Sequence, residues 1–498
     1  MKNDEILHAL EHIDADLIQA ADALPKKKPT RPYWYAAVAA VLALAIALPI
    51  ALNGLRKPAD LPHITAPPNW TDETVPIGGP MLVPLSMVEP VYPTMAPCPN
   101  YADYTDREQY QLDYDAWQRG QKRQYNQPKG YADSLTNFFQ ASIEQFLQGE
   151  GNSTYSPVNV YLAMAMLAET AHGNSCWQIL NLFGLDNIDQ LRKQASYVWN
   201  AHYSDDQKTT LKIANSLWLD DAYAFKQATA ERLAETYYAS SFSGDLGTDE
   251  ANQKLQAWLN QNTAGLLQEQ AKKVELDPES VFALASTIYF SASWEDEFSE
   301  GQTWKDTFHS PKGDRTVPFM HKSLRQYTCY RGENFSAISL RLSGNNDIWF
   351  ILPDEGHTAE EILKSDGYLK LTMNPDAWEN QNSYIINLSL PKFDVADQKD
   401  LIAGMKAMGI TDVFDSSVSD FTSITDTTDL YVGKIDHAAR VSIDETGCFG
   451  AAFTVIDVPR GSEPNPMETI NFVLDRPFLF VVSSRDNLPL FAGIVNEP

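Results

Sequence analysis

The stretch from Ile443 to Phe478 restricts the possible folds of this chain more than any other part of its sequence. Alternate residues in its first part are small, namely Cys448, Gly450, Ala452 and Thr454. In a strand, alternate side chains point to opposite faces, so one face of this segment is nearly bare. Such a segment is suited to slide between two strands that already pack over a core.

The continuation of this stretch has the composition of an exposed loop. Residues 459–466 contain three prolines, a glycine and Arg460. Proline lacks the amide hydrogen that a sheet ladder needs, and together with glycine it is typical of turns. The sequence therefore predicts a strand-like segment joined directly to an exposed loop.

The composition is that of a globular protein with an acidic surface. Of the 498 residues, 44% are hydrophobic and 11% are aromatic, which is enough for a large core. The formal net charge of -28 is opposite to the basic footprint of nucleic-acid-binding proteins, so no nucleic-acid partner is predicted. Solubility is the simpler interpretation of the acidity.

The sequence does not indicate a site for catalysis, a metal or a cofactor. The GxSxG, HExxH, Walker and GxGxxG motifs do not occur, and the nine histidines lack metal-ligand spacing. The chain is therefore predicted not to be an enzyme. The four cysteines lie far apart without a CxxC pair, and whether any of them form a disulfide stays open: Cys98, Cys176, Cys329 and Cys448.

The first 52 residues have the pattern of a signal-anchor. Residues 1–32 are predicted to form a cytoplasmic tail with a short amphipathic helix, whose role the sequence does not show. Residues 33–52 are an uncharged run long enough to span a bilayer as a transmembrane helix. Basic residues are more numerous before this run than after it, which predicts a cytoplasmic N-terminus in a single-pass protein of the cell membrane. A cleaved signal peptide is the alternative, but its charged region would be unusually long.

Two further regions follow the predicted anchor. Residues 53–129 are rich in proline and polar residues and are predicted to form a semi-extended extracellular stalk. Within them, residues 101–123 are tyrosine-rich and compatible with a helix, to which we assign no function. Residues 130–498 alternate helical and β-rich patterns without an internal repeat, which predicts one α+β domain.

A series of motifs runs through residues 130–498. Residues 152–167 read NSTYSPVNVYLAMAML, and residues 282–298 read FALASTIYFSASWEDEF. VPFM, ILPDEG and LPKFDV follow in that order, His437 then precedes Glu445 by eight residues, and the chain closes with DRPFLF and LPLFAGIVNEP. In order and spacing, these motifs resemble the serpin family of serine protease inhibitors, of the bacterial type.

The resemblance implies a serpin fold: a large central, mostly antiparallel β-sheet with surrounding helices and an exposed C-terminal reactive loop, here at about residues 446–470. It also assigns residues to the hinge, through which the loop enters the sheet: Glu445, Gly447, Cys448, Gly450, Ala451, Ala452 and Thr454. Others belong to the shutter and breach, where the central sheet parts: Ser156, Asn159, Ser286, Trp294 and His437. Asn159 and Ser286 replace the family's usual serine and asparagine, so we expect the hydrogen bonds of the shutter's polar network to differ from those of the family.

The resemblance further implies a suicide-substrate mechanism, in which a serine protease forms a covalent acyl complex with the loop and the loop inserts into the central sheet. We therefore expect a membrane-anchored, monomeric inhibitor of trypsin-like serine proteases, with its serpin domain outside the cell and residues 33–52 in the lipid bilayer. A non-inhibitory serpin-fold module for binding or chaperoning is the alternative, because Phe449 and Gly450 depart from the family's acidic residue and alanine. An enzyme or adhesin on an unrelated fold would require the motif series to be coincidental.

Arg460–Gly461 is the predicted reactive bond. Family spacing from Glu445 places the bait residue at Arg460 or Gly461, and an arginine offers a trypsin-like pocket a charge-assisted pair. The loop is longer than is usual in the family, so Met467 and Val458 are alternatives. A further alternative is that Arg460 is only a solvated loop residue. The sequence does not name the physiological protease or show whether the ectodomain is shed.

Overall fold

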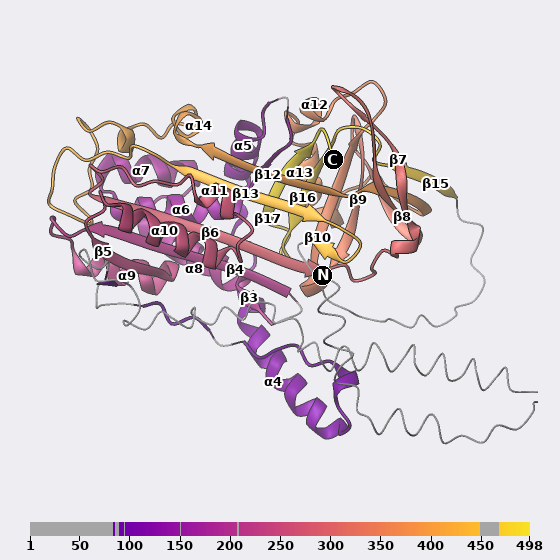
Figure 1. The fold of residues 1–498 in the computed structure, drawn as a ribbon, viewed down its shortest axis with the longest axis horizontal. Coiled ribbons are helices and arrows are strands. Elements are labelled where there is room, and N and C mark those ends of the chain that lie inside the picture. Colours follow the sequence, from indigo (N-terminus) through magenta and orange to yellow (C-terminus); the bar gives the residue numbers. More distant parts are fainter. Residues whose placement is uncertain (1–82, 85–88, 94, 150, 207–208, 449–467) are drawn as a thin grey trace, which may run out of the picture. The chain divides into compact units, whose positions relative to one another are not determined.

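The computed structural model describes residues 83–84, 89–93, 95–149, 151–206, 209–448 and 468–498 (Figure 1). The chain divides into two compact units, Met1–Thr74 and Val75–Pro498, and all described residues belong to the second. The predicted tail, the predicted anchor at 33–52 and the first part of the stalk lie outside the described residues. Within the described ranges, no helix has the length and apolar character needed to cross a membrane.

An eight-stranded sheet, here called sheet A, forms the centre of the second unit (Figure 1). Its strand order is β1-β5-β4-β6-β14-β13-β12, with β3 paired to β4. Its strands are β1 (Val83–Pro84), β3 (Ser204–Asp205), β4 (Thr209–Asp220), β5 (Ala239–Gly244), β6 (Phe282–Ser293), β12 (Phe393–Asp400), β13 (Asp436–Ile443) and β14 (Gly447–Cys448). Neighbouring strands are antiparallel except β4 and β5, which are parallel.

A nine-stranded sheet, here called sheet B, has the order β15-β11-β8-β9-β10-β16-β17-β2, with β7 paired to β8. Its strands are β2 (Ser153–Tyr155), β7 (Thr303–Ser310), β8 (Gly313–Arg331), β9 (Phe335–Leu342), β10 (Asn346–Pro353), β11 (Gln381–Pro391), β15 (Thr469–Val473), β16 (Phe478–Ser483) and β17 (Pro489–Val495). The last two strands form a hairpin that is buried along its whole length, because nearly every residue in them is apolar.

Helices cover both faces of sheet A. On β4, Ile213 and Trp218 point to opposite faces, since side chains alternate along a strand. Ile213 belongs to the main core with the residues of α6, whereas Trp218 packs with Leu255 and Trp258 of α10 in a second cluster. The helices are α4 (Arg107–Tyr125), α5 (Thr136–Phe146), α6 (Pro157–Thr170), α7 (Gly173–Leu182), α8 (Ile188–His202), α9 (Gln227–Tyr237), α10 (Asp249–Asn262), α11 (Gln268–Ala271), α12 (Ala359–Leu363), α13 (Gly367–Met373) and α14 (Ile402–Ala407).

Helix α6 is the central helix of the fold and packs against β6 of sheet A and β17 of sheet B. All but one of its residues are buried, which matches its largely apolar sequence, in which Glu169 is the one charged residue. Ser156 caps its N-terminus by accepting a hydrogen bond from the amide of Asn159 at 3.4 Å. Pro157 occupies the first helical position, where a missing amide hydrogen leaves no bond unmade.

Part of the range predicted as a stalk is folded onto the domain. The ring of Tyr92 lies 5.8 Å from that of Trp199 in α8, and the indole N–H of Trp117 in α4 donates to Asp206 at 3.1 Å. Tyr92 and Trp117 are thus partly buried against the domain, so this part of the predicted stalk packs on it. The pattern of prolines and charges did not reveal this packing, since the partner residues lie far away in the sequence.

Candidate functional site

The predicted hinge begins with the two-residue strand β14, which lies between β6 and β13 and runs antiparallel to both. Gly447 pairs with Ser293, and Cys448 pairs with Ala292 on one side and Ile443 on the other. Within the described part of the chain, sheet A connects β6 to β13 only through β14. The start of the predicted loop therefore occupies a strand position inside the sheet.

The hinge backbone lies so close to β6 that position 447 needs a glycine. A Cβ atom at this position would collide with the carbonyl oxygen of Ala292 and come within 2.7 Å of the Cα atom of Ser293. Backbone atoms on a central strand cannot move aside easily, so glycine is the residue that fits here.

A turn at residues 444–447 leads the chain from β13 into β14. The carboxylate of Asp444 accepts hydrogen bonds from the amides of Thr446 at 2.8 Å and Gly447 at 3.3 Å. Trp294, buried directly after β6, donates its indole N–H to the carbonyl oxygen of Asp444 at 2.8 Å and its amide to that of Thr446 at 3.1 Å. These bonds connect the end of β6 to the end of β13 beside the hinge.

Glu445 ties the hinge to residues outside sheet A. Its carboxylate accepts a hydrogen bond from the hydroxyl of Thr303 in β7 at 2.9 Å and one from the Lys392 ammonium at 2.7 Å. Burial raises the pKa of Glu445, but the bonds from Lys392, from the backbone and from Thr303 outweigh burial and leave the pKa below its usual value. The charged carboxylate therefore holds the start of the loop at neutral pH.

Sequence reasoning did not find these two partners of Glu445. Lys392 lies 53 positions away from it and Thr303 lies 142 positions away. Lys392 stands within the LPKFDV motif and Thr303 follows the Trp294 motif. The motifs indicate the family resemblance, but they do not show that these side chains contact Glu445. We call Trp294, Thr303, Lys392 and residues 444–447 the breach.

Cys448 is fully buried in the main core. Burial, and then the charge of Asp444, raise the pKa of its thiol, so the side chain stays protonated and behaves as a small apolar group. Its position agrees with the sequence pattern, because it belongs to the set of small alternate residues. Cys176, Cys329 and Cys448 are free thiols.

Asn159 and Ser286, the two positions that depart from the family pattern, are hydrogen-bonded to each other. The Ser286 hydroxyl donates to Asn159 Oδ1 at 2.6 Å, and Asn159 Nδ2 donates to the carbonyl oxygen of Ser286 at 3.3 Å. The serpin resemblance implies a serine at position 159 and an asparagine at position 286, so the two residue types are exchanged here. A serine–asparagine contact therefore joins α6 to β6 with the residues reversed.

His437 joins β13 to the same helix. Its Nε2 accepts a hydrogen bond from the amide of Ser156 at 3.1 Å, and the Ser156 hydroxyl donates to the carbonyl oxygen of Leu490 at 2.6 Å. Burial lowers the pKa of His437 to about 3, and the charge of Lys399 contributes in the same direction. The imidazole is thus neutral, and its acceptor nitrogen makes a structural bond. We call Ser156, Asn159, Ser286 and His437 the shutter.

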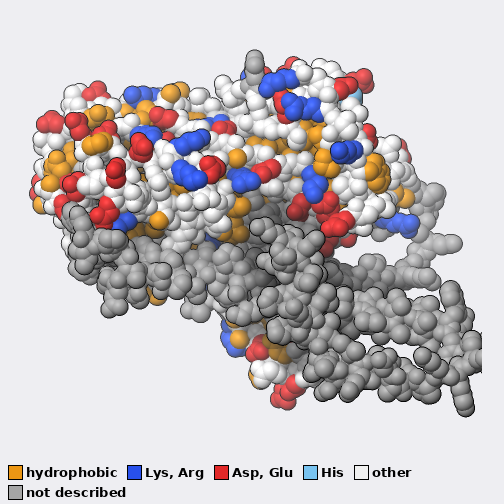
Figure 2. Space-filling model, viewed as in Figure 1, with side chains coloured by type: hydrophobic (Ala, Val, Ile, Leu, Met, Phe, Trp, Pro, Cys, Tyr) orange, Lys and Arg blue, Asp and Glu red, His pale blue; other side chains and the backbone are white. Residues whose placement is uncertain are grey.

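The remaining predicted site residues lie outside the described residues. They are the hinge residues Gly450, Ala451, Ala452 and Thr454, the reactive-bond residues Arg460 and Gly461, and the alternative bait residues Val458 and Met467. Among the described residues, no group of three or more His, Cys, Asp or Glu side chains is arranged to hold a metal ion. On the visible face, Lys and Arg are interspersed with Asp and Glu (Figure 2).

Comparison with known proteins agrees with this architecture. The family model described as Serpin (serine protease inhibitor) matches residues 133–498. Alpha-1-antiproteinase 2 of Equus caballus is 29% identical over 375 residues, which cover 72% of this chain and 85% of the relative. Serpin-ZX of Arabidopsis thaliana is 26% identical over 368 residues, which cover 70% of this chain and 92% of the relative.

Solved structures share the fold. The native state of tengpin, a thermophilic serpin, superposes with a TM-score of 0.66 at 25% identity and covers 75% of this chain and 95% of its own. Thyroxine-binding globulin in complex with thyroxine gives a TM-score of 0.61 at 23% identity, with 74% and 98% covered. Residues 133–498, which the family model matches, contain every described helix and strand except β1, α4 and a short 3-10 turn before α4. The chain therefore belongs to the serpin family, whose protease-inhibitor relatives, such as alpha-1-antiproteinase 2, are not enzymes.

Proposed function

We propose that this protein is a bacterial-type, membrane-anchored serpin that inhibits trypsin-like serine endopeptidases as a suicide substrate. The observation that carries the proposal is the position of β14, which begins a strand antiparallel to both of its neighbours. A loop cleaved at its far end can extend this strand without changing the pairing already made. Strand addition to a sheet supplies main-chain hydrogen bonds along the full length of the added segment.

The register of β14 determines which loop residues would face the core. Continued from the Cys448–Ala292 pair, it brings Ala452 opposite Ile288, and Gly450 opposite Phe290. All three β6 residues belong to the main core. The inserted strand would therefore place its small side chains on the core face, and its two phenylalanines on the other face.

The same register brings Thr454 to the shutter. Six residues beyond Cys448, Thr454 comes opposite Ser286 on β6 and His437 on β13. A threonine hydroxyl can donate and accept a hydrogen bond. It is therefore suited to replace part of the hydrogen bonding that Ser286 and His437 make with α6 in this structure.

Loop insertion is triggered by the acylation step of ordinary proteolysis. The serine oxygen of the protease attacks the carbonyl carbon of Arg460, the bond to the nitrogen of Gly461 breaks, and the new amine leaves with a proton. An ester between the protease and Arg460 remains. Insertion of the released loop then carries the esterified protease away from its starting position before water hydrolyses the ester, and the strain of the uncleaved fold drives this step.

The proposed topology places the serpin domain outside the cell. It rests on the uncharged run at residues 33–52 and on the excess of basic residues before it. Protease added to intact cells should then cleave the reactive loop. If the loop is cut only after the cells are lysed, the proposed orientation is contradicted.

Incubation with trypsin tests the proposed inhibition. We expect a complex that survives denaturing electrophoresis, and a released C-terminal fragment that begins at Gly461 by mass spectrometry. Arg460→Ala should abolish complex formation with trypsin, whereas Arg325→Ala, an exposed control on β8, should not. Cleavage without a complex would favour the non-inhibitory alternative, and a fragment that begins elsewhere would move the reactive bond.

A further inference from the structure

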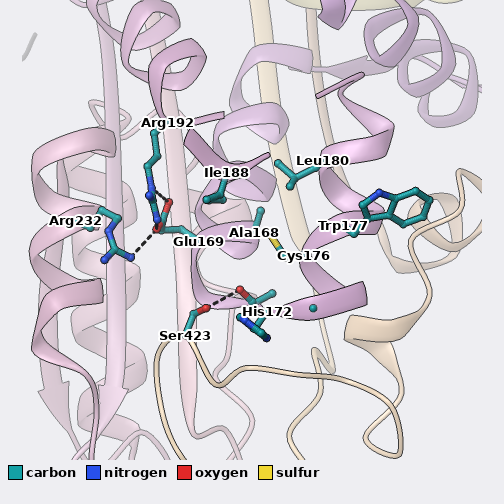
Figure 3. A pocket seen from close by; sticks show the side chains of 12 residues that line it. Ala168, Glu169, His172, Cys176, Trp177, Leu180, Ile188, Arg192, Arg232 and Ser423 are labelled. Carbon is teal, nitrogen blue, oxygen red and sulfur yellow. Dashed lines mark hydrogen bonds and ion pairs between the residues drawn. The ribbon is translucent and has the colours of Figure 1, made fainter. Parts of the chain in front are cut away.

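A cavity of about 350 Å³ lies at the C-terminal end of α6, bordered by α7, α8 and α9 (Figure 3). It belongs to neither the hinge nor the shutter. Its volume is within the range of pockets that hold small organic ligands. Charged side chains lie at one side, and aliphatic side chains line the space between them and Trp177 (Figure 3).

The charged side is built around Glu169, whose side chain is almost completely buried. Arg192 binds this carboxylate through Nε at 3.0 Å and Nη2 at 2.5 Å, and Arg232 binds it through Nη1 at 2.9 Å. The hydroxyl of Tyr237 adds a further contact at 3.3 Å. The negative charge of Glu169 is therefore compensated by its own partners.

The two arginines differ in how much of their hydrogen-bonding capacity is used. Arg192 also donates its Nη1 to Asp189 at 2.7 Å, so all three of its nitrogens are engaged. Arg232 has Glu169 as its one hydrogen-bond acceptor among the described residues, and 36% of its side chain is exposed. An arginine has five N–H donors in a planar fork, so Arg232 keeps donors for a carboxylate that enters the cavity.

The rest of the cavity is suited to a hydrocarbon chain. Leu180 and Ile188 lie between the arginines and Trp177, together with Ala168 (Figure 3), and Ala171 also lines the cavity. Trp177 is 54% exposed, which is unusual for a residue with so large an apolar side chain. A ligand that covers it would remove apolar surface from water.

We propose that this cavity binds a medium-chain carboxylate such as decanoate, with its head group on Arg232 and its chain directed over Ile188 and Leu180 toward Trp177. Glu169 fixes the orientation of Arg232 and does not contact the ligand. None of the described residues that line the cavity belongs to the reactive loop, so this proposal does not depend on the proposed inhibition. The cavity is bordered by the last turn of α6, and the first turn of that helix carries the shutter contacts.

Titration of the full chain with decanoate, followed by tryptophan fluorescence, tests the proposal. We expect a saturable change that is lost in Trp177→Phe, together with a thermal unfolding midpoint that rises with decanoate concentration. Decanol lacks the head group and acetate lacks the chain, so both should bind at least roughly tenfold more weakly, as loss of one charge-assisted contact or of the apolar burial predicts.

Two variants separate a binding site from a structural charge cluster. Arg232→Gln should weaken decanoate binding by roughly tenfold or more, whereas Arg325→Gln, an exposed control, should not. Ile188→Trp fills the cavity without changing its charges and should abolish binding. Thermal unfolding without ligand shows whether each variant is folded. Equal binding of decanoate and decanol, no saturable binding, or full binding by a folded Arg232→Gln protein would each overturn the proposal.

Discussion

The breach and the shutter both connect β6 to β13, but they do so with different kinds of contact. At the breach, the indole of Trp294 and the charged carboxylate of Glu445 hold the turn from which the hinge strand starts. At the shutter, two neutral and largely buried hydrogen-bonded pairs attach β6 and β13 to the first turn of α6. The breach therefore acts on the loop, whereas the shutter acts on the strands that the loop has to separate.

This difference assigns different roles to the two regions in the proposed mechanism. Breach contacts already stabilise the first two residues of the inserted strand, so they can persist while the strand grows. Shutter contacts hold β6 and β13 in their present positions over α6, so insertion has to exchange them for contacts with incoming residues such as Thr454. Changes on the insertion path should then alter protease trapping, whereas shutter changes should alter the stability of the uncleaved fold.

The largest expected effect is that of Ala452→Pro, which lies on the insertion path between the two regions. Proline removes an amide that the inserted strand needs, and the interior of a sheet does not accept it. We expect a folded protein that trypsin cleaves but that no longer forms a denaturant-stable complex on electrophoresis. Asn465→Pro, beyond the proposed bond, is the matched control and should still trap the protease. Normal trapping by Ala452→Pro would show that this residue does not enter the sheet.

Gly447→Ala tests the breach itself. The added Cβ atom would collide with the Ala292 carbonyl oxygen, so the hinge strand has to move away from β6. Insertion should slow, and at least severalfold more inhibitor should be consumed per protease trapped, measured by titration of active trypsin. At Gly433 an added Cβ would be 3.7 Å from Tyr431, an ordinary contact, so Gly433→Ala is a suitable control. An unchanged stoichiometry in Gly447→Ala would mean that β14 does not start the insertion.

The exchanged pair at the shutter gives a prediction about stability. Asn159→Ala leaves the Ser286 hydroxyl without its acceptor, which should cost about 2–3 kcal/mol in the free energy of unfolding measured with denaturant. The double variant Asn159→Ser with Ser286→Asn restores the residues usual in the family and should recover most of that loss. Asn159→Ser and Ser286→Asn are also measured separately. If the effect of the double variant on the free energy of unfolding equals the sum of these two single effects, the residues are not coupled.

A smaller effect is expected from the pH dependence of His437. Its pKa is lowered to about 3 in the folded protein, whereas an unfolded histidine has a pKa of about 6.5. The unfolded chain therefore binds the proton first, and this residue's contribution to stability falls as the pH drops from about 6.5 toward 3. Between pH 7 and pH 5 the loss should be about 2 kcal/mol, and His437→Gln should lack it. An identical pH dependence in the two proteins would contradict the buried, neutral imidazole.

The sequence allowed the fold and part of the site to be predicted, for identifiable reasons. The small alternate residues of the hinge, Trp294 and His437 stand in local motifs, so their neighbourhood could be anticipated. The Asn159–Ser286 contact could also have been predicted, because two departures from one pattern are complementary to each other. The bonds from Thr303 and Lys392 to Glu445 could not, since one sequence does not show which distant polar residues meet. The packing of Tyr92 and Trp117 was missed for the same reason.

The central claim is that the cleaved loop becomes a strand between β6 and β13. Hydrogen–deuterium exchange of the amides of residues 449–458, compared between the intact and the trypsin-cleaved protein, measures this directly. The account predicts that these amides, together with those of β6 and β13, exchange much more slowly after cleavage, because each becomes part of a sheet ladder. Exchange of residues 449–458 that stays as fast after cleavage as before it would contradict the account.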